Sequence, residues 1–129
     1  MAVTITSDLV EAYSLCPRKA FLLMMGATPD PGPHDYELVI REQAEANRQA
    51  HRVRLAKAGE VVSFSSPADL AAGRDVLADA ELATGVLRAR CDFIVKVDKP
   101  SRLGRHSYEP VKVIGTCRAS RTDALGLVY

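Results

Sequence analysis

Apolar and polar positions at the start of the chain follow the period of a helix. Ser7 and Asp8 are typical of a helix N-terminus, and the apolar residues within 9–13 that follow them have the spacing of one helical face. Pro17 suits the first turn of a second helix, which continues with apolar residues to Met25. The pattern predicts a bent pair of helices.

A third helix is predicted to be the longest. Residues 28–35 contain three prolines and one glycine and are expected to form a loop. Residues 36–58 contain neither residue, are rich in Ala, Glu, Gln and Arg, and repeat apolar residues at helical spacing. Gly59 is a typical C-terminal cap for this helix.

The second half of the chain alternates in the manner of strands. Residues 61–64 form a short strand candidate, and residues 66–69 resemble a helix start that leads into a helix through residues 70–80. Three strands are then predicted, at residues 82–90, 91–98 and 107–114. The last two flank a turn-rich segment and are expected to form an antiparallel hairpin.

Two local patterns add detail to this second half. Strict alternation places Cys91 and Phe93 on one face of their strand and Asp92 and Ile94 on the other. Residues 120 and 123, a serine and an aspartate, resemble a capping box that opens a final helix.

The order of these elements predicts an α/β or α+β fold with a small mixed sheet flanked by helices. At 129 residues, of which 47% are hydrophobic, the chain fits one domain with a single core. We expect a helical part at residues 1–59 and a sheet-containing part at residues 60–129.

Charge and cysteine content narrow the classes of function. The net charge of +1 excludes a global basic field, so any contact with DNA needs a local patch. The three cysteines are an odd number without CxxC spacing, which indicates buried thiols in a reducing compartment. No apolar run is long enough to span a bilayer, and we expect a cytoplasmic protein without a membrane partner.

Three stretches resemble the RecB-like nucleases of the PD-(D/E)xK superfamily, which include CRISPR-associated exonucleases and an uncharacterised bacterial RecB-like group. Residues 7–26 are similar to the opening helices of that family around a Cys-Pro step. Residues 87–113 resemble its segment with a metal-binding aspartate, a hairpin turn and a strand with the catalytic acid and lysine. Residues 37–57 lie where the family places its first metal-binding His or Glu. The resemblance implies a restriction-endonuclease-like core and metal-dependent hydrolysis of DNA.

The resemblance also assigns residues to a site. Asp92 matches the aspartate of the central strand, and Glu45 is the preferred ligand on the long helix, with Glu42 and His51 as alternatives. With Glu109, Asp92 and Glu45 would bind Mg²⁺ or Mn²⁺ beside the scissile phosphate. Glu45 also lies three and four residues from arginines, so surface ion pairs are an alternative explanation.

The strand that should carry the catalytic acid and lysine departs from the family pattern. Lys112 and Ile114 occupy those two places. Glu109 is the candidate acid and Lys112 the candidate catalytic lysine, but residues three apart on a strand face opposite ways. They would converge only if Pro110 marked a bulge. We therefore expect nuclease activity to be absent or nearly so.

Cys16 stands where many relatives carry the first of four iron–sulfur ligands. Cys91 and Cys117 do not have the spacing of the remaining ligands, so we expect no iron–sulfur cluster on this chain.

These observations leave three hypotheses. The first is a RecB-like nuclease domain, or a remnant of one, that acts in DNA processing. The second is a non-catalytic DNA-binding or protein-interaction module that keeps the fold. The third is that a missing C-terminal segment completes the core and the site, because the final residues are apolar. The basic residues available for DNA contact fall into three groups: Arg18 and Lys19; Arg48, Arg52 and Arg54; and Arg88, Arg90, Arg102 and Arg105.

Overall fold

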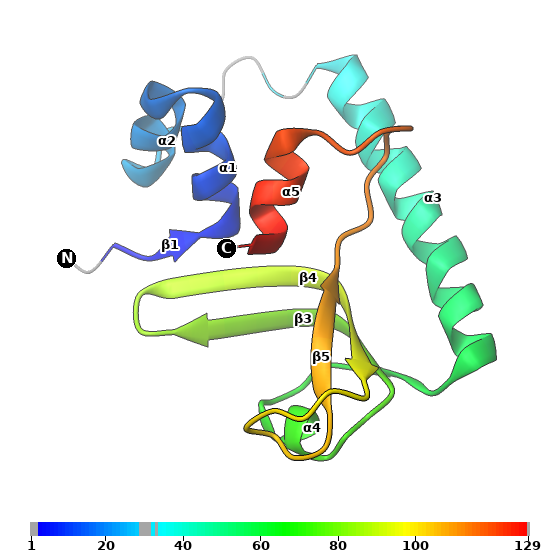
Figure 1. Cartoon of the computed structure of the whole chain (residues 1–129). Helices are drawn as coiled ribbons and strands as arrows, with labels where there is room; N and C mark the ends of the chain where they lie inside the picture. Colours follow the sequence, from blue (N-terminus) through cyan, green and yellow to red (C-terminus); the bar gives the residue numbers. More distant parts are fainter. Residues whose placement is uncertain (1–2, 29–31, 33, 129) are drawn as a thin grey trace.

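The computed structural model describes residues 3–28, 32 and 34–128, and the first half of this part is mainly helical (Figure 1). The helices are α1 (Ser7–Leu15), α2 (Pro17–Met24) and α3 (Asp35–Ala58). The predicted long helix is confirmed, and it ends at Gly59, whose N–H donates to the carbonyl oxygen of Leu55 at 3.0 Å. Of the predicted loop, residues 29–31 and 33 lie outside the described residues, and its last residue begins α3.

The bent pair of helices at the start is confirmed, with a different N-cap. The hydroxyl oxygen of Thr6 accepts from the N–H of Leu9 at 3.3 Å, and Ser7 is already the first residue of α1. Cys16 has extended backbone (φ −160°) between the two helices, and Pro17 occupies the first turn of α2 as predicted.

The sheet draws its five strands from both parts of the chain. They are β1 (Ile5–Thr6), β2 (Val61–Ser63), β3 (Val76–Thr84), β4 (Leu87–Val97) and β5 (Ser107–Val111). β3 pairs antiparallel with β4, and β4 pairs antiparallel with β5, which confirms the predicted hairpin. β1 pairs parallel with β4 and β2 pairs parallel with β3, so the sheet is mixed. The chain is therefore an α+β domain, and its first part supplies a strand that the sequence patterns did not predict.

Two of the predicted elements after residue 65 are wrong in their extent. The helix α4 (Ala68–Ala71) has only four residues, because Gly73 turns the chain with a positive φ of 72° and a buried strand then begins at Val76. The predicted strand at residues 82–90 is divided by a turn at Gly85 (φ 56°). Its two halves belong to β3 and β4.

The final helix α5 (Arg121–Val128) begins with the predicted capping box. The backbone N–H and the hydroxyl of Ser120 donate to Asp123, at 2.7 and 2.8 Å, and the N–H of Asp123 donates back at 3.1 Å. α5 packs beside α1 (Figure 1), so residues from both ends of the chain share one layer.

The core has one cluster on each face of the sheet. Phe93, Val76 and Ala78 pack with Leu55 of α3. On the other face, the buried Leu77, Ala80 and Ile94 have partly buried neighbours from strands, from the short α4 and from the residue after β2, but none from a long helix: Val62, Phe64, Leu70, Cys91 and Tyr108. Long helical cover is thus present on one face only in the described part of the chain. Among the described residues, no helix is both long enough and apolar enough to cross a membrane.

Candidate functional site

Asp92 lies on β4 where the strand pair is irregular. Its neighbour across β3 is Asp79, between the paired residues Ala78 and Ala80, and Asp79 has a positive φ of 54°. Alternation of side chains fails here. Phe93 packs with the α3 cluster, whereas Cys91 and Ile94 pack on the opposite face. The predicted placement of Cys91 on the same face as Phe93 is therefore wrong.

Both carboxylate oxygens of Asp92 have protein donors. The Nε of Arg48 on α3 donates to Oδ1 at 2.8 Å, and the backbone N–H of Val113 donates to Oδ2 at 2.7 Å. The side chain of Asp92 is 18% exposed and that of Arg48 is 32% exposed. Asp92 thus joins α3, β4 and the segment after β5.

The same arginine reaches the preferred ligand on α3. Arg48 forms an ion pair with Glu45, and the amide of Gln49 donates to Glu45 at 2.8 Å. The candidate ligands Glu45 and Asp92 are thus brought to one guanidinium, which lies between them. The surface ion pair considered from the sequence is present, and it extends to Asp92.

The two alternative ligands on α3 have different surroundings. Glu42 is exposed. His51 is half-buried, with its ring centroid 5.5 Å from that of Phe93, in the layer between α3 and the sheet.

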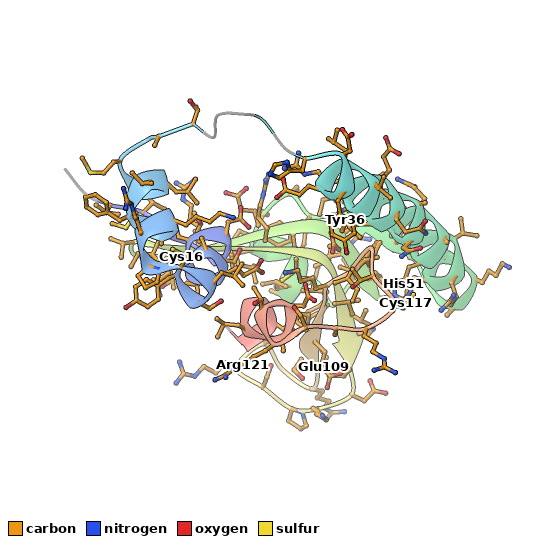
Figure 2. The ribbon with its side chains drawn as sticks, turned by 90° about the horizontal axis from the view of Figure 1, so that it is seen from above. Cys16, Tyr36, His51, Glu109, Cys117 and Arg121 are labelled. Carbon is orange, nitrogen blue, oxygen red and sulfur yellow. The ribbon has the colours of Figure 1, made fainter. Side chains whose placement is uncertain are left out.

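Glu109 and Lys112 do not converge on Asp92. Glu109 lies opposite Val95 in the register and forms an exposed ion pair with Lys99 at 3.2 Å. Figure 2 shows Glu109 apart from α3, which carries His51. The pairing of β4 with β5 continues in register through Pro110, so the bulge required for convergence is not present.

Lys112 instead joins helices from the two ends of the chain. Its ammonium group forms an ion pair with Glu11 of α1 and lies 4.0 Å from a carboxylate oxygen of Asp123 on α5. A Cβ added to Gly126 would collide with the Glu11 carboxylate and lie 3.2 Å from the Lys112 ammonium. A glycine therefore lets α5 approach this ion pair.

The segment after β5 lies close against α3. The side-chain amide of Asn47 donates to the carbonyl oxygen of Ile114 at 2.8 Å. A Cβ at Gly115 would collide with the carbonyl oxygen of Ile40 and lie 3.0 Å from the N–H nitrogen of Ala44. Ile114, which the sequence resemblance places at the position of the expected lysine, therefore belongs to a segment that is held close against α3.

The cysteines are separate from one another. Cys16 and Cys117 are exposed and lie at opposite ends of the molecule (Figure 2), which corrects their assignment as buried thiols. Cys91 is half-buried, and burial, with a smaller effect of the Asp92 charge, raises the pKa of its thiol. Within the described residues, no group of three or more His, Cys, Asp or Glu side chains could hold a metal ion.

The second half of α3 is rich in positive charge. Residues 46–59 contain four cationic side chains and no Asp or Glu: Arg48, Arg52, Arg54 and Lys57. A groove of about 310 Å³ separates this half of α3 from the segment after β5, and its lining includes Asn47, His51 and Arg54. Arg54 and Lys57 are three residues apart on α3 and therefore point to the same side.

Comparisons with known proteins give no assignment: no protein-family model, curated protein or solved structure matches this chain. The roles of residues therefore rest on geometry. The contacts of Arg48 with Asp92 and of Lys112 with Glu11 are the two that the sequence did not predict. A positive charge three residues from Glu45 was visible in the sequence, but nothing in the pattern connected it with Asp92.

Proposed function

We propose that this chain is a non-catalytic DNA-binding domain of the RecB-like type, with a restriction-endonuclease-like core, that acts in DNA processing. The family assignment rests on the sequence resemblance of residues 7–26, 37–57 and 87–113. The observation that carries the binding function is the cationic second half of α3 beside its polar groove.

The contacts of Asp92 support the non-catalytic part of the proposal. A divalent cation at this site would need the carboxylate oxygens that now accept from Arg48 and Val113, and it would be repelled by the guanidinium. Lys112 is engaged in an ion pair with Glu11 of α1. Mg²⁺ or Mn²⁺ is therefore not part of the proposed function, although weak binding at Asp92 is open to measurement.

Phosphate contact is the role we propose for the cationic side chains of residues 46–59 other than Arg48, which already has Glu45 and Asp92 as partners. Arg54 lines the groove, and Lys57 lies on the same side of the helix, so the two are placed to follow a nucleic-acid backbone. Such contacts bind DNA without reading its sequence. The proposal is a weak, salt-dependent and sequence-independent interaction.

The test of binding is fluorescence anisotropy with labelled single- and double-stranded DNA at several salt concentrations. The Arg54→Gln/Lys57→Gln variant should bind more weakly, and the slope of log K against log salt should fall by about 2 for duplex DNA. The matched control is Arg18→Gln/Lys19→Gln, which removes the same charge from α2. Equal losses in both variants, or no binding by the parent chain, would contradict DNA recognition by α3.

The test of catalysis is degradation of the same DNA with Mg²⁺ or Mn²⁺. We expect no cleavage above background by the parent chain. Metal-dependent cleavage that disappears in Asp92→Ala would overturn the non-catalytic assignment and restore Glu109 and Lys112 as candidates.

A second candidate function, contact with a partner protein, is favoured by the surface of α1 and α2. Large apolar side chains are widely exposed there, including Tyr13 (64%), Leu15 (66%), Phe21 (59%) and Met25 (70%). A photo-crosslinking residue at position 21 should form protein adducts in cells, whereas one at position 43 on α3 should not. Adducts at neither position would count against this candidate.

A further inference from the structure

The sheet face opposite α3 carries a hollow that neither DNA binding nor the family resemblance explains. Its volume is about 680 Å³, within the range of small-molecule sites. The lining comes from β3, β4, β5, α4, α5 and the loop between β4 and β5. Its apolar members include Leu82, Leu87, Cys91, Ile94, Leu103 and Leu127.

The hollow exists because this face lacks a long helix in the described part of the chain. α4 has four residues and supplies one lining side chain, Leu70. In α+β domains the helices gather on one face or at one end of the sheet, so the opposite face depends on other cover. Here Leu87 and Leu103 are each 38% exposed, and Leu127 is 41% exposed. The floor is the buried Ile94, so the hollow is a concave extension of the core.

The charged side chains in the lining have one sign. Among the described residues that line the hollow, the charged ones are Arg88 and Arg102, and none is an aspartate or glutamate. Arg88 lies 3.6 Å from Glu81, with both side chains about half exposed, so its charge is only partly offset. An apolar hollow with guanidinium groups in its lining is complementary to an apolar ligand with an anionic head.

We propose that this hollow binds a single-chain anionic amphiphile, with the alkyl chain over Ile94 and Cys91 and the carboxylate at Arg102 or Arg88. The alkyl chain would cover the sheet face that the short α4 leaves open. A guanidinium matches a carboxylate with two parallel N–H donors, which gives the head group its preference over a cation of the same chain length.

This site is independent of the proposed DNA-binding surface, which uses the other side of the sheet. Loss of one function therefore does not imply loss of the other. Binding should strengthen with chain length, by up to about fourfold for each methylene that enters the hollow. The series octanoate, decanoate and dodecanoate tests this dependence.

Cys91 gives a local readout because it lines the hollow. In a Cys16→Ser/Cys117→Ser background it is the remaining thiol, and its alkylation rate by a maleimide reports access to this face. Sodium dodecanoate, below its micelle concentration, should slow the alkylation in a saturable manner. The trimethylammonium amphiphile of equal chain length should protect much less. Isothermal titration calorimetry should give one site per chain.

Two variants locate the ligand. Arg102→Gln should weaken protection by dodecanoate about tenfold and reduce the difference between the anionic and cationic amphiphiles. Ala83→Phe places a ring in the hollow from an exposed lining position and should abolish protection, while circular dichroism confirms that the chain is folded. Phe21→Ser on α2 is the control and should leave protection unchanged.

Three results would overturn the proposal. One is a Cys91 alkylation rate that no amphiphile changes. Another is equal protection by the anionic and cationic amphiphiles, which would remove the role of the arginines. The last is loss of protection in Phe21→Ser but not in Ala83→Phe, which would place the ligand on α2.

Discussion

Replacing Asp92 with alanine should destabilise the fold, because the carboxylate is a structural connection in the contacts described above. The substitution removes the acceptor of the Val113 N–H and the partner of the Arg48 guanidinium. A nuclease site predicts the opposite. Carboxylates gathered for a metal ion repel one another in its absence, so removing one leaves the apoprotein equally or more stable.

The size of the loss follows from the exposure of the two partners. An orphaned N–H in a partly buried position costs about 1–2 kcal/mol, and a hydrogen bond to a charged group contributes about 1.5–3 kcal/mol when it is shielded. Arg48 is 32% exposed and retains Glu45 as a partner, so the loss of its ion pair with Asp92 should cost about 1 kcal/mol. The sum is about 2–3 kcal/mol, or a fall in Tm of about 6–10 °C for a domain of this size.

Urea denaturation followed by circular dichroism at neutral pH measures this change. Glu109→Ala is the matched control, because its carboxylate also has a cationic partner, Lys99, but both side chains are exposed (59% and 72%). The control should lose no more than about 0.5 kcal/mol. The Arg48→Ala variant and the Arg48→Ala/Asp92→Ala double variant complete a double-mutant cycle with Asp92→Ala. The expected coupling energy between Arg48 and Asp92 is about 1 kcal/mol.

A neutral or stabilising Asp92→Ala substitution would refute this reasoning. The refutation would be complete if Mg²⁺ or Mn²⁺ also raised the stability of the parent chain and not of the variant, because binding to the folded state stabilises it.

Three further predictions concern other contacts. Gly115→Ala should destabilise the fold by about 1–3 kcal/mol in urea denaturation, because the added Cβ would enter the backbone of α3. Gly32→Ala, with open space around it, should be nearly neutral, and equal effects of the two substitutions would contradict the close approach. Lys112→Met should leave Glu11 and Asp123 without their shared cation and increase the rate of amide hydrogen exchange in α5. Lys112→Arg should preserve the protection of these amides, and unchanged exchange in Lys112→Met would contradict a role of the lysine in holding α5. Hydrogen bonds, first that from the backbone N–H of Ser65, lower the pKa of Asp69 from 3.8, so the stabilising effect of its carboxylate is present above pH 3.8 and is lost as pH falls through the lower folded-state pKa. The stability difference between the parent chain and Asp69→Asn should therefore shrink as the pH falls below 3.8. A normal or raised pKa of Asp69 in carboxyl NMR titration would contradict this prediction.

The elements that could be predicted from sequence were those fixed by local signals. α3 was visible because 23 residues from Tyr36 to Ala58 lack Gly and Pro, and α5 because Ser120 and Asp123 form a local capping box. The β4–β5 hairpin was visible from alternation on both sides of a turn. In each case the decisive residues are close together in the chain.

The errors have physical reasons of their own. Residues 76–80 are predicted as helix because a helix start at residues 66–69 precedes them, but four of the five are buried in the sheet as part of β3. β1 has two residues and pairs with a strand more than 80 positions away, so no local periodicity could reveal it. Cys91 and Phe93 are predicted on the same face of β4 but lie on opposite faces. The strand pair is irregular beside Asp79, whose positive φ an alternating sequence pattern does not reveal.

The candidate site was only partly predictable. The sequence placed Glu45 and Asp92 near one another, and the structure brings both to Arg48. From the sequence, Arg48 is expected as a surface partner of Glu45 or as a DNA contact, because its contact with Asp92 over 44 residues is invisible to spacing rules. The same holds for Lys112, whose partner Glu11 is 101 residues away.

The 101 residues between Glu11 and Lys112 delay the contact between these two side chains during protein synthesis. At about 5–20 residues per second, roughly 5–20 s pass between the appearance of Glu11 and that of Lys112, and α5 follows later still. Throughout this interval α1 and α2 have their apolar side chains, but α1 lacks α5, the helix that packs beside it. The exposed apolar side chains of α1 and α2 are therefore accessible to a ribosome-associated chaperone during this interval, and slow translation would lengthen their exposure.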